Sequence, residues 1–351
     1  MNDQSVELLV QQLAPLTGKC LIVADENWAS TAWNAVAHSG TSQRVLFSNR
    51  DEIARGAQAT GMEAQFNDFD FSTLEPASFD HVLFRVSKER AVTHHIINCA
   101  SALLKDGGQL ILSGEKTDGI KTYTDAACQL FGDSSRPQKN GIYYLSIISK
   151  YRVSDDPLDD KDYTQLRAIN TKPTLLSKPG IFGWNKVDQG SAFLIGYLPK
   201  LLERYPAGDN AKSLLDLGCG YGYLACSANE FGFERIVATD NNAAALLACN
   251  ANFNALGIAG VVVAGDAGSE LNERFDTIVC NPPFHQGFNI DSALTEKFLS
   301  ATKRLITSRG RALFVVNNFI ALEKKARDYF SCVEEVGRSG SFKLIMVAHK
   351  P

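Results

Sequence analysis

The sequence predicts an α/β protein built from two tandem doubly wound domains. Three observations support this fold class: strands alternate with helices, most strands are apolar throughout, and the second half repeats the element order of the first. Alternating strands and helices are typical of a sheet with helices on both faces. Strands that are apolar throughout are typical of buried parallel strands. The chain has 351 residues, which is enough for two ordinary domains.

The second half contains the clearer pattern. A helix is expected over 243–254, ending near Gly257. Extended runs at 332–336 and 342–348, separated by the turn residues 337–340, predict an antiparallel hairpin at the C-terminus. The expected parallel strands are residues 213–217, 235–240, 261–264, 275–279 and 311–316.

The first half follows the same order, which favours a duplicated domain. Phe79-Asp80 matches Phe275-Asp276, and Gly107-Gly108 precedes a strand as Arg309-Gly310 does. The alternative is that any two α/β domains look alike at this level of detail. The strands expected here are residues 20–25, 44–47, 79–84 and 109–112.

An acidic segment separates the two halves. Residues 154–162 contain proline and few apolar side chains, so a solvated connector is expected there. We therefore expect a first domain over 1–153, a linker over 154–170 and a second domain over 171–351.

Composition excludes several classes of protein. No apolar stretch is long enough to span a membrane, and the start has no basic region followed by an apolar run. The eight cysteines form neither a Cys-x-x-Cys pair nor a Cys/His cluster, so we expect no metal, no disulfide framework and a reducing cytoplasm. The net charge is −4, and residues 1–150 hold 13 basic against 17 acidic side chains. Charge alone does not predict nucleic-acid binding.

A glycine-rich loop follows the strand 213–217. Its glycines, Gly218, Gly220 and Gly222, are spaced G-x-G-x-G, whereas a dinucleotide-binding loop has G-x-G-x-x-G. Asp216 precedes the loop. A carboxylate would repel a pyrophosphate but would favour a ligand with an ammonium and a sulfonium group. The pattern therefore favours S-adenosylmethionine over NAD.

Acidic residues follow the next two strands. Asp240 can accept both hydroxyls of a ribose, with Asn241 beside it, although a helix N-cap is the alternative. Asp266 can accept from an adenine amino group while the N–H of Ala267 faces the ring, although a plain loop acid is the alternative. The glycine loop and two acids at successive strand ends predict a cofactor site.

The fourth strand runs into Asn281-Pro282-Pro283-Phe284. The side-chain oxygen of Asn281 and the carbonyl of Pro282 can each accept one N–H of a target amine, which aims its lone pair at a methyl group. Phe284 can stack on the planar group that carries the amine. Orientation of this kind can supply roughly 7–11 kcal/mol of a reaction barrier. A common Asn-Pro turn and a core phenylalanine are the alternatives.

These two motifs resemble those of the class I methyltransferases that methylate amino groups. Asn-Pro-Pro-Phe in place of Asn-Pro-Pro-Tyr, the segment 180–191 and the late run 317–319 resemble the ribosomal RNA small subunit methyltransferase C (RsmC) family over nearly the whole chain. This sequence departs from the family at Gly183, where a serine is expected.

The resemblance implies two tandem Rossmann-like class I methyltransferase domains, with a degenerate N-terminal copy that binds no cofactor. It implies methylation of guanine N2 in 16S ribosomal RNA of the small subunit, at the guanine that the family numbers 1207. It also implies that Phe182 and Asp188 form a flap over cofactor and target, with a packed β-ribbon as the alternative. We expect a monomer. The first domain is expected to grip RNA through Arg85, Lys88 and Arg90, or else only to support the second domain.

Three other functions compete with this one. The same chemistry could act on adenine N6 in DNA or on a glutamine amide, but Phe284 and the duplicated domain argue against both. A non-catalytic RNA-binding or ribosome-assembly module is disfavoured by the intact set of Gly218, Asp240 and Asn281. A nicotinamide dehydrogenase is disfavoured by Asp216 and the glycine spacing.

Overall fold

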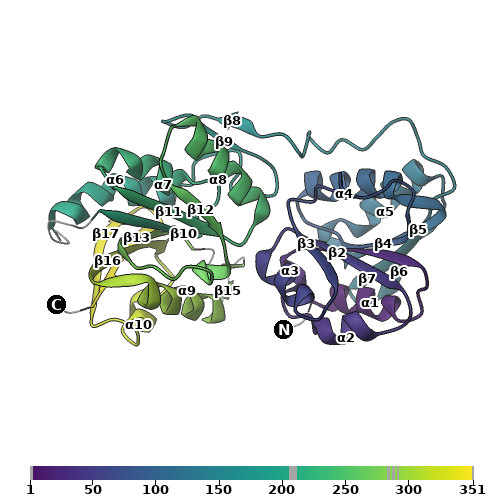
Figure 1. The fold of residues 1–351 in the computed structure, drawn as a ribbon, viewed down its shortest axis with the longest axis horizontal. Coiled ribbons are helices and arrows are strands. Elements are labelled where there is room, and N and C mark those ends of the chain that lie inside the picture. The colour runs from purple at the N-terminus through teal and green to yellow at the C-terminus, as the bar shows by residue number, and fades with distance from the viewer. Residues whose placement is uncertain (1–2, 205–211, 283–284, 287–288, 291, 350–351) are drawn as a thin grey trace. The chain divides into compact units, whose positions relative to one another are not determined.

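The computed structural model divides the chain into two compact units, Met1–Gln165 and Leu166–Pro351 (Figure 1). It describes residues 3–204, 212–282, 285–286, 289–290 and 292–349, the four residues 285, 286, 289 and 290 by their backbone only. Each unit contains one seven-stranded sheet.

The sheet of the first unit has the strand order β3-β2-β1-β4-β5-β7-β6. The strands β1 to β5 pair in parallel, whereas β7 is antiparallel to both β5 and β6. The bounds are β1 (Lys19–Ala24), β2 (Gln43–Ser48), β3 (Glu63–Phe66), β4 (Phe79–Arg85), β5 (Leu104–Glu115), β6 (Gln138–Asn140) and β7 (Tyr143–Ser149).

Helices cover both faces of this sheet because side chains along each strand alternate between the faces. Leu21 and Val23 of β1 pack in a core with α4 and α5, whereas Cys20 and Ile22 pack in a core with α1, α2 and α3. The helical elements are α1 (Gln4–Leu13), η1 (Glu26–Trp28), α2 (Trp33–His38), α3 (Asp51–Gln58), α4 (Arg90–Leu103), η2 (Lys116–Asp118) and α5 (Ile120–Phe131).

The sheet of the second unit has the corresponding order β12-β11-β10-β13-β16-β18-β17. The last two strands form the antiparallel hairpin that the sequence predicts, although β17 is longer than expected. The strands are β10 (Ser213–Leu217), β11 (Arg235–Asp240), β12 (Val261–Ala264), β13 (Phe275–Cys280), β16 (Ile306–Asn317), β17 (Cys332–Ser339) and β18 (Phe342–Ala348).

Helices also cover both faces of the second sheet. One face packs against α6, α7 and α8, and the other against α9 and α10. Two short antiparallel pairs, β8 with β9 and β14 with β15, lie outside the large sheet. The remaining elements are β8 (Arg167–Ile169), β9 (Leu175–Ser177), α6 (Gln189–Arg204), α7 (Tyr223–Ala228), η3 (Asn229–Phe231), α8 (Ala243–Ala255), η4 (Asp266–Gly268), β14 (His285–Gln286), β15 (Asn289–Ile290), α9 (Ser292–Leu305) and α10 (Leu322–Ala326).

The two units repeat each other in fine detail, which confirms the predicted duplication. The pairing of β4 with β5 shifts register between Phe79 and His81, and that of β13 with β16 shifts between Phe275 and Thr277. The strands β5 and β16 have the same pattern of buried and exposed residues. These shared irregularities are independent of the general α/β pattern, so they argue for a common origin of the two units.

One pair of aspartates illustrates the repeat. The carboxylate of Asp80 accepts a hydrogen bond from the backbone N–H of Lys19 at 2.8 Å, where β1 begins. The carboxylate of Asp276 accepts one from the backbone N–H of Ser213 at 3.3 Å, where β10 begins. Each aspartate fixes the start of the central strand, and this explains why a Phe-Asp pair occurs in both halves.

The acidic segment between the halves is anchored to the first unit. Its side chains are mostly exposed, as expected for a connector. However, the Asn98 side chain hydrogen-bonds both backbone groups of Leu158, at 2.8 and 2.9 Å. Tyr163 is fully buried, with its ring 4.6 Å from that of His95 and its hydroxyl donating to Asp68. The segment is therefore fastened to α4 and its surroundings rather than solvated along its whole length.

No helix in the described part of the chain is long and apolar enough to cross a membrane.

Replacing Tyr163 with alanine should destabilise the first unit, because it empties a fully buried site. We expect a loss of about 3–5 kcal/mol in the free energy of unfolding. Urea denaturation in a Trp184→Phe background would report on the first unit through Trp28 and Trp33. The matched control is Tyr151→Ala, because Tyr151, shortly before the segment, is 70% exposed. Equal effects of the two substitutions would contradict this account of the segment.

Candidate functional site

The predicted site residues of the second unit gather at the carboxyl ends of β10, β11, β12 and β13. These strands are parallel neighbours, so the loops that follow them meet at one edge of the sheet. Two contacts show this directly. The backbone N–H of Gly220 donates to Asp240 at 2.9 Å, and the backbone N–H of Gly265 donates to the carbonyl of Asp240 at 3.0 Å.

The glycine loop connects β10 to α7, and its glycines have left-handed backbone angles. Gly222 begins α7 with φ 85°, and a Cβ at this position would lie 2.6 Å from Sγ of Cys249. Gly222 is therefore required by close packing as well as by backbone conformation. Gly220 has φ 54°, and among the described residues the nearest atom to its Cβ position is 4.0 Å away, on Ile181. The backbone at Gly220 is therefore accessible to a ligand. Gly218 precedes them with φ 80°.

Asp216 lies at the end of β10 and is fully buried. One carboxylate oxygen accepts a hydrogen bond from the backbone N–H of Ala225 at 2.9 Å, and the other, Oδ1, has no partner among the described residues. Burial raises the pKa of Asp216 to about 7, with a further contribution from the carboxylate of Asp240. A buried acceptor without a partner is costly, so a donor or cation beside Asp216 would be favoured.

Asp240 joins the glycine loop to the next strand. Its Oδ2 accepts from Gly220, and its Oδ1 accepts from the backbone N–H of Asn242 at 2.9 Å. The side chain that caps α8 is that of Asn242, which accepts from the backbone N–H of Ala244 at 3.0 Å. The helix-cap alternative for Asp240 is therefore wrong. Asn241 lies between the strand and the helix, next to Asp240.

The next strand end forms a short turn. Asp266 begins η4, and Ala267 has φ 48° and ψ 44°, which is unusual for a residue with a side chain. The carboxylate of Asp266 forms an ion pair with Lys297 of α9. Sequence reasoning missed Lys297 because it lies 31 residues further along the chain. The structure thus places a charged pair where an adenine contact was expected.

The side chain of Asn281, directly after β13, is held by its nitrogen. Its Nδ2 donates to Oδ1 of Asp188 at 2.7 Å and to Oγ of Ser191 at 2.8 Å. A carboxylate only accepts hydrogen bonds, so the NH₂ end must face Asp188 and the oxygen lies on the other side of the carboxamide. Pro282 is buried beside it, whereas Phe284 lies outside the described residues.

The segment before α6 lies against the glycine loop. The carbonyl of Gly180 accepts from the side chain of Asn242 at 2.9 Å, and the carbonyl of Lys186 accepts from the hydroxyl of Tyr221 at 3.4 Å. Phe182 is 80% exposed in this segment. Asp188 caps α6 by accepting from the backbone N–H of Ser191 at 2.9 Å. The sequence could have pointed to Ser191, because an acidic residue three positions before it is typical of a capped helix start.

The first unit has different residues at the corresponding places. The shared strand register aligns Ile22 with Asp216, Ala24 with Gly218, and Ser48 with Asp240. Arg85 ends β4 where Asn281 follows β13.

The expectation that Arg85 grips RNA is wrong, because its side chain is buried in ion pairs. Its guanidinium lies 2.8 Å from Asp118 and 3.2 Å from Asp3. Lys88 and Arg90 are exposed, and the ammonium of Lys88 lies 3.9 Å from Asp118. Arg85 is thus an internal charge that the first unit neutralises with its own acids.

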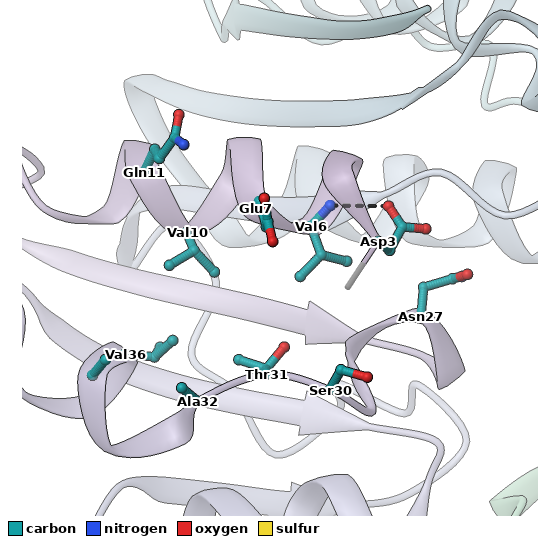
Figure 2. Close-up of a pocket in the computed structure, with 11 residues that line it drawn as sticks. Asp3, Val6, Glu7, Val10, Gln11, Asn27, Ser30, Thr31, Ala32 and Val36 are labelled. Atoms are coloured by element: carbon teal, nitrogen blue, oxygen red, sulfur yellow. Dashed lines mark hydrogen bonds between the residues drawn. The ribbon is translucent and has the colours of Figure 1, made fainter. Parts of the chain in front are cut away.

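The first unit contains a pocket beside the segment that follows β1 (Figure 2). Its walls come from α1 and from residues 27–36, and they include Val6, Val10 and Val36. Asp3 and Glu7 add acidic groups. Ile22, Ala24, Ser48 and Arg85, which align with residues of the site in the second unit, are not among the described residues that line this pocket. Within the described residues, no group of His, Cys, Asp and Glu side chains is arranged to hold a metal ion.

Comparison with known proteins agrees with the fold. Residues 172–346 match the family described as Methyltransferase small domain, and residues 6–137 match the family described as Methyltransferase small domain N-terminal. The chain belongs to the methyltransferase small domain family. Within it, the chain is similar to proteins named Ribosomal RNA small subunit methyltransferase C.

Two of these relatives show the extent of the similarity. The protein from Aeromonas hydrophila is 28% identical over 284 residues, which cover 79% of this chain and 80% of the relative. The protein from Pseudomonas syringae pv. tomato is 28% identical over 308 residues, which cover 82% and 85%.

One solved structure has the same two-unit fold. It is the T. thermophilus 16S rRNA N2 G1207 methyltransferase (RsmC) in complex with AdoMet and guanosine, with a TM-score of 0.82 and 23% identity. The match covers 99% of this chain and 92% of that one.

The packing role of Gly222 can be tested against Gly232. Both glycines have left-handed angles, φ 85° and 78°, but a Cβ at Gly232 meets no atom of a described residue within 4 Å. Because backbone strain is common to both, Gly222→Ala should cost roughly 1–3 kcal/mol more than Gly232→Ala in the free energy of unfolding, through overpacking against Cys249. Chemical denaturation of both variants measures this difference, and equal costs would show that Cys249 moves aside freely.

Proposed function

We propose that this protein transfers a methyl group from S-adenosylmethionine to the exocyclic N2 amino group of one guanine in 16S ribosomal RNA of the small ribosomal subunit. The observation that carries the proposal is the geometry of Asn281, whose carboxamide is held by its nitrogen at a strand end beside the glycine loop. The relatives' names and the guanosine in the T. thermophilus complex point to the same reaction. The guanine is 1207 in the name of that protein.

The residues at the strand ends suit S-adenosylmethionine. When bound, this cofactor supplies an electrophilic methyl group on a positively charged sulfur. Asp216 offers a buried oxygen that has no partner among the described residues, and the space that these residues leave open at Gly220 lets a ligand approach the backbone. Asp240 and Asn241 are proposed to hold the ribose, and Asp266 and Ala267 the adenine. Asp216, Gly218, Gly220 and Gly222 form the rest of the cofactor site.

Asn281 and Pro282 are proposed to orient the target amine. The lone pair of an exocyclic amine is delocalised into the ring, so the free nitrogen is a weak nucleophile. Two acceptors, the Asn281 carboxamide oxygen and the Pro282 carbonyl, can each bind one N–H and favour a more tetrahedral nitrogen. These hydrogen bonds strengthen as positive charge develops on the nitrogen, so they stabilise the transition state more than the ground state. Proline offers no competing N–H.

Two aromatic side chains complete the proposed substrate site. Phe284 is proposed from the sequence to stack on the guanine, and it lies outside the described residues. Phe182 is 80% exposed on the segment that lies against the glycine loop, where it can stack on the target base or a neighbour. A guanine inside a helix must be unstacked to reach such a site, at a cost of a few kcal/mol.

The two units are proposed to have different roles. Residues 171–351 form the catalytic domain, residues 1–153 form a degenerate domain without a cofactor, and residues 154–170 link them. Ile22, Ser48 and Arg85 at the corresponding strand ends support this division of labour. The enzyme is proposed to act as a monomer in the cytoplasm without a metal. All eight cysteines are free thiols, which agrees with a reducing compartment.

The reaction can be tested with small subunits from cells that lack the enzyme. Labelled methyl transfer followed by nucleoside mass spectrometry should yield N2-methylguanosine from 16S RNA. Methylated adenine, methylated protein or no product would each reject the proposed substrate.

Asn281→Ala should lower methyl transfer by roughly 100-fold or more, because it removes one of the two groups that orient the amine. The dissociation constant of S-adenosylmethionine should change little. Single-turnover transfer and equilibrium dialysis measure the two quantities, with Asn254→Ala, at an exposed position of α8, as the control. If cofactor binding falls in parallel with turnover, Asn281 belongs to the cofactor site instead.

The affinity for S-adenosylmethionine should depend on pH through Asp216. In the free protein its pKa is about 7, so at lower pH the carboxyl group is neutral. A cationic ligand favours the carboxylate, and binding should therefore strengthen by roughly tenfold between about pH 5.5 and pH 7 while a proton is released. Asp216→Asn should flatten this dependence in calorimetric titrations. A wild-type profile as flat as that of the variant would contradict a direct role for Asp216.

The same pKa shift has the opposite sign for stability without ligand. The pKa of Asp216 is raised from 3.8 to about 7 by folding, so the folded state binds the proton more tightly than the unfolded state. The stabilising contribution of this group is complete below the unfolded pKa of 3.8, and it is lost as the pH rises from there through the folded pKa of about 7.

A further inference from the structure

We infer that Asp188 and Ser191 are positioning residues, which fix the end of the Asn281 carboxamide that faces the target amine. The inference rests on the proposed function, because it gives the orientation of Asn281 a consequence for methyl transfer. Asp188 then acts by contacting Asn281 rather than the substrate. Ser191 joins Asp188 as the second acceptor of the same NH₂ group.

Orientation matters because the two ends of a carboxamide have nearly the same shape and opposite hydrogen-bonding character. The oxygen accepts hydrogen bonds and the NH₂ group donates two. A target amine presents only N–H groups toward its acceptors, so a flipped carboxamide would set donor against donor. A site built on asparagine therefore needs something that distinguishes the two ends.

The charge of Asp188 makes this distinction. An ionised carboxylate has no proton to donate, so it can bind the NH₂ end of Asn281 but not the oxygen end. The hydrogen bond is short, 2.7 Å, as expected when the acceptor is charged. The hydroxyl of Ser191 can donate or accept, so it strengthens the preference without being able to set it alone.

Asp188 is itself held firmly. The same oxygen that binds Asn281 accepts from the backbone N–H of Ser191, so the carboxylate is part of the first turn of α6. A Cβ at Gly190 would lie 3.0 Å from this oxygen and 3.0 Å from the ring of Phe342. The absence of a side chain at Gly190 thus allows Asp188, α6 and the start of β18 to pack closely. The carboxylate that orients Asn281 is thus held by the first turn of a helix rather than by a loop.

The first unit contains a related contact with another outcome. Asp3 caps α1 by accepting from the backbone N–H groups of Ser5 and Val6, at 2.7 and 3.2 Å. Figure 2 shows the bond to Val6. Asp3 also pairs with Arg85 at the end of β4. In both units, a carboxylate at a helix start binds a donor at the end of the fourth strand of the shared fold. Only in the second unit is the donor part of a carboxamide, whose oxygen at the other end can accept a hydrogen bond.

The decisive variants remove both acceptors and keep the helix start. Serine is as good a helix cap as aspartate, but its side chain is too short to hold Asn281 in the same way. We therefore expect Asp188→Ser with Ser191→Ala to fold and to bind S-adenosylmethionine. Its kcat should fall by roughly 10- to 100-fold, the range that corresponds to a lost hydrogen bond to a charged group. The KM for the small subunit should change little.

A second substitution, Asn281→Asp, should change kcat in opposite directions in the two backgrounds. Asn281→Asp places oxygens at both ends of the side chain, so it needs no orientation. In the otherwise wild-type protein it faces Asp188, and the two like charges should lower kcat strongly. In the Asp188→Ser, Ser191→Ala background the repulsion is absent, and Asn281→Asp should raise kcat.

The inference is decided by whether Asn281→Asp raises or lowers kcat in the Asp188→Ser, Ser191→Ala background. A purely structural role predicts that Asn281→Asp lowers kcat by the same factor in both backgrounds, and that result would overturn the inference. If the combined background does not fold, the single variant Asp188→Ser, with and without Asn281→Asp, gives the same test, because it alone removes the like charge. Ser191→Ala keeps Asp188, so Asn281→Asp should still lower kcat in that background. Failure of the proposed function would look different, because the unaltered protein would then form no N2-methylguanosine.

Discussion

Parallel pairing of β10 with β11 and β13 is the constraint on which the site depends. It brings the ends of strands far apart in the sequence to one edge of the sheet. At that edge the carboxylate of Asp240 accepts hydrogen bonds from both Gly220 and Asn242, so a single side chain ties the glycine loop to the next strand end. The buried cores on both faces fix the register, since a shift by one residue would turn apolar side chains out of the core.

The duplication separates what the fold requires from what the chemistry requires. Both units retain the aspartate that fixes the start of the central strand, the register shift in the fourth strand and a carboxylate at the helix start. These features stabilise the sheet and its covering helices. The positions that would contact a ligand have diverged, and Arg85 with its acidic partners fills the place of Asn281. The same architecture thus supports a site in one unit and an internal ion-pair cluster in the other.

The electrostatics of the site suit a cationic ligand and a neutral amine. Burial and the nearby carboxylate of Asp240 raise the pKa of Asp216, and one of its oxygens has no partner in the part of the chain that the structure describes. Asp188 adds a third carboxylate, directed at the nitrogen end of Asn281. Nothing in this arrangement requires a strong base, because orienting acceptors are sufficient for an amine that reacts through its lone pair.

The sequence by itself determined the α/β class, the duplication, the hairpin and the motifs, because apolar periodicity and short-range glycine and proline signals are local. It also placed Asp216, Asp240 and Asn281 at strand ends. Only the tertiary structure decided that Asn242 rather than Asp240 caps α8, that Arg85 is buried, that Lys297 pairs with Asp266, and that Asp188 holds Asn281. These contacts join residues that are distant along the chain or compete for one role, and they depend on side-chain directions that the folded sheet alone sets.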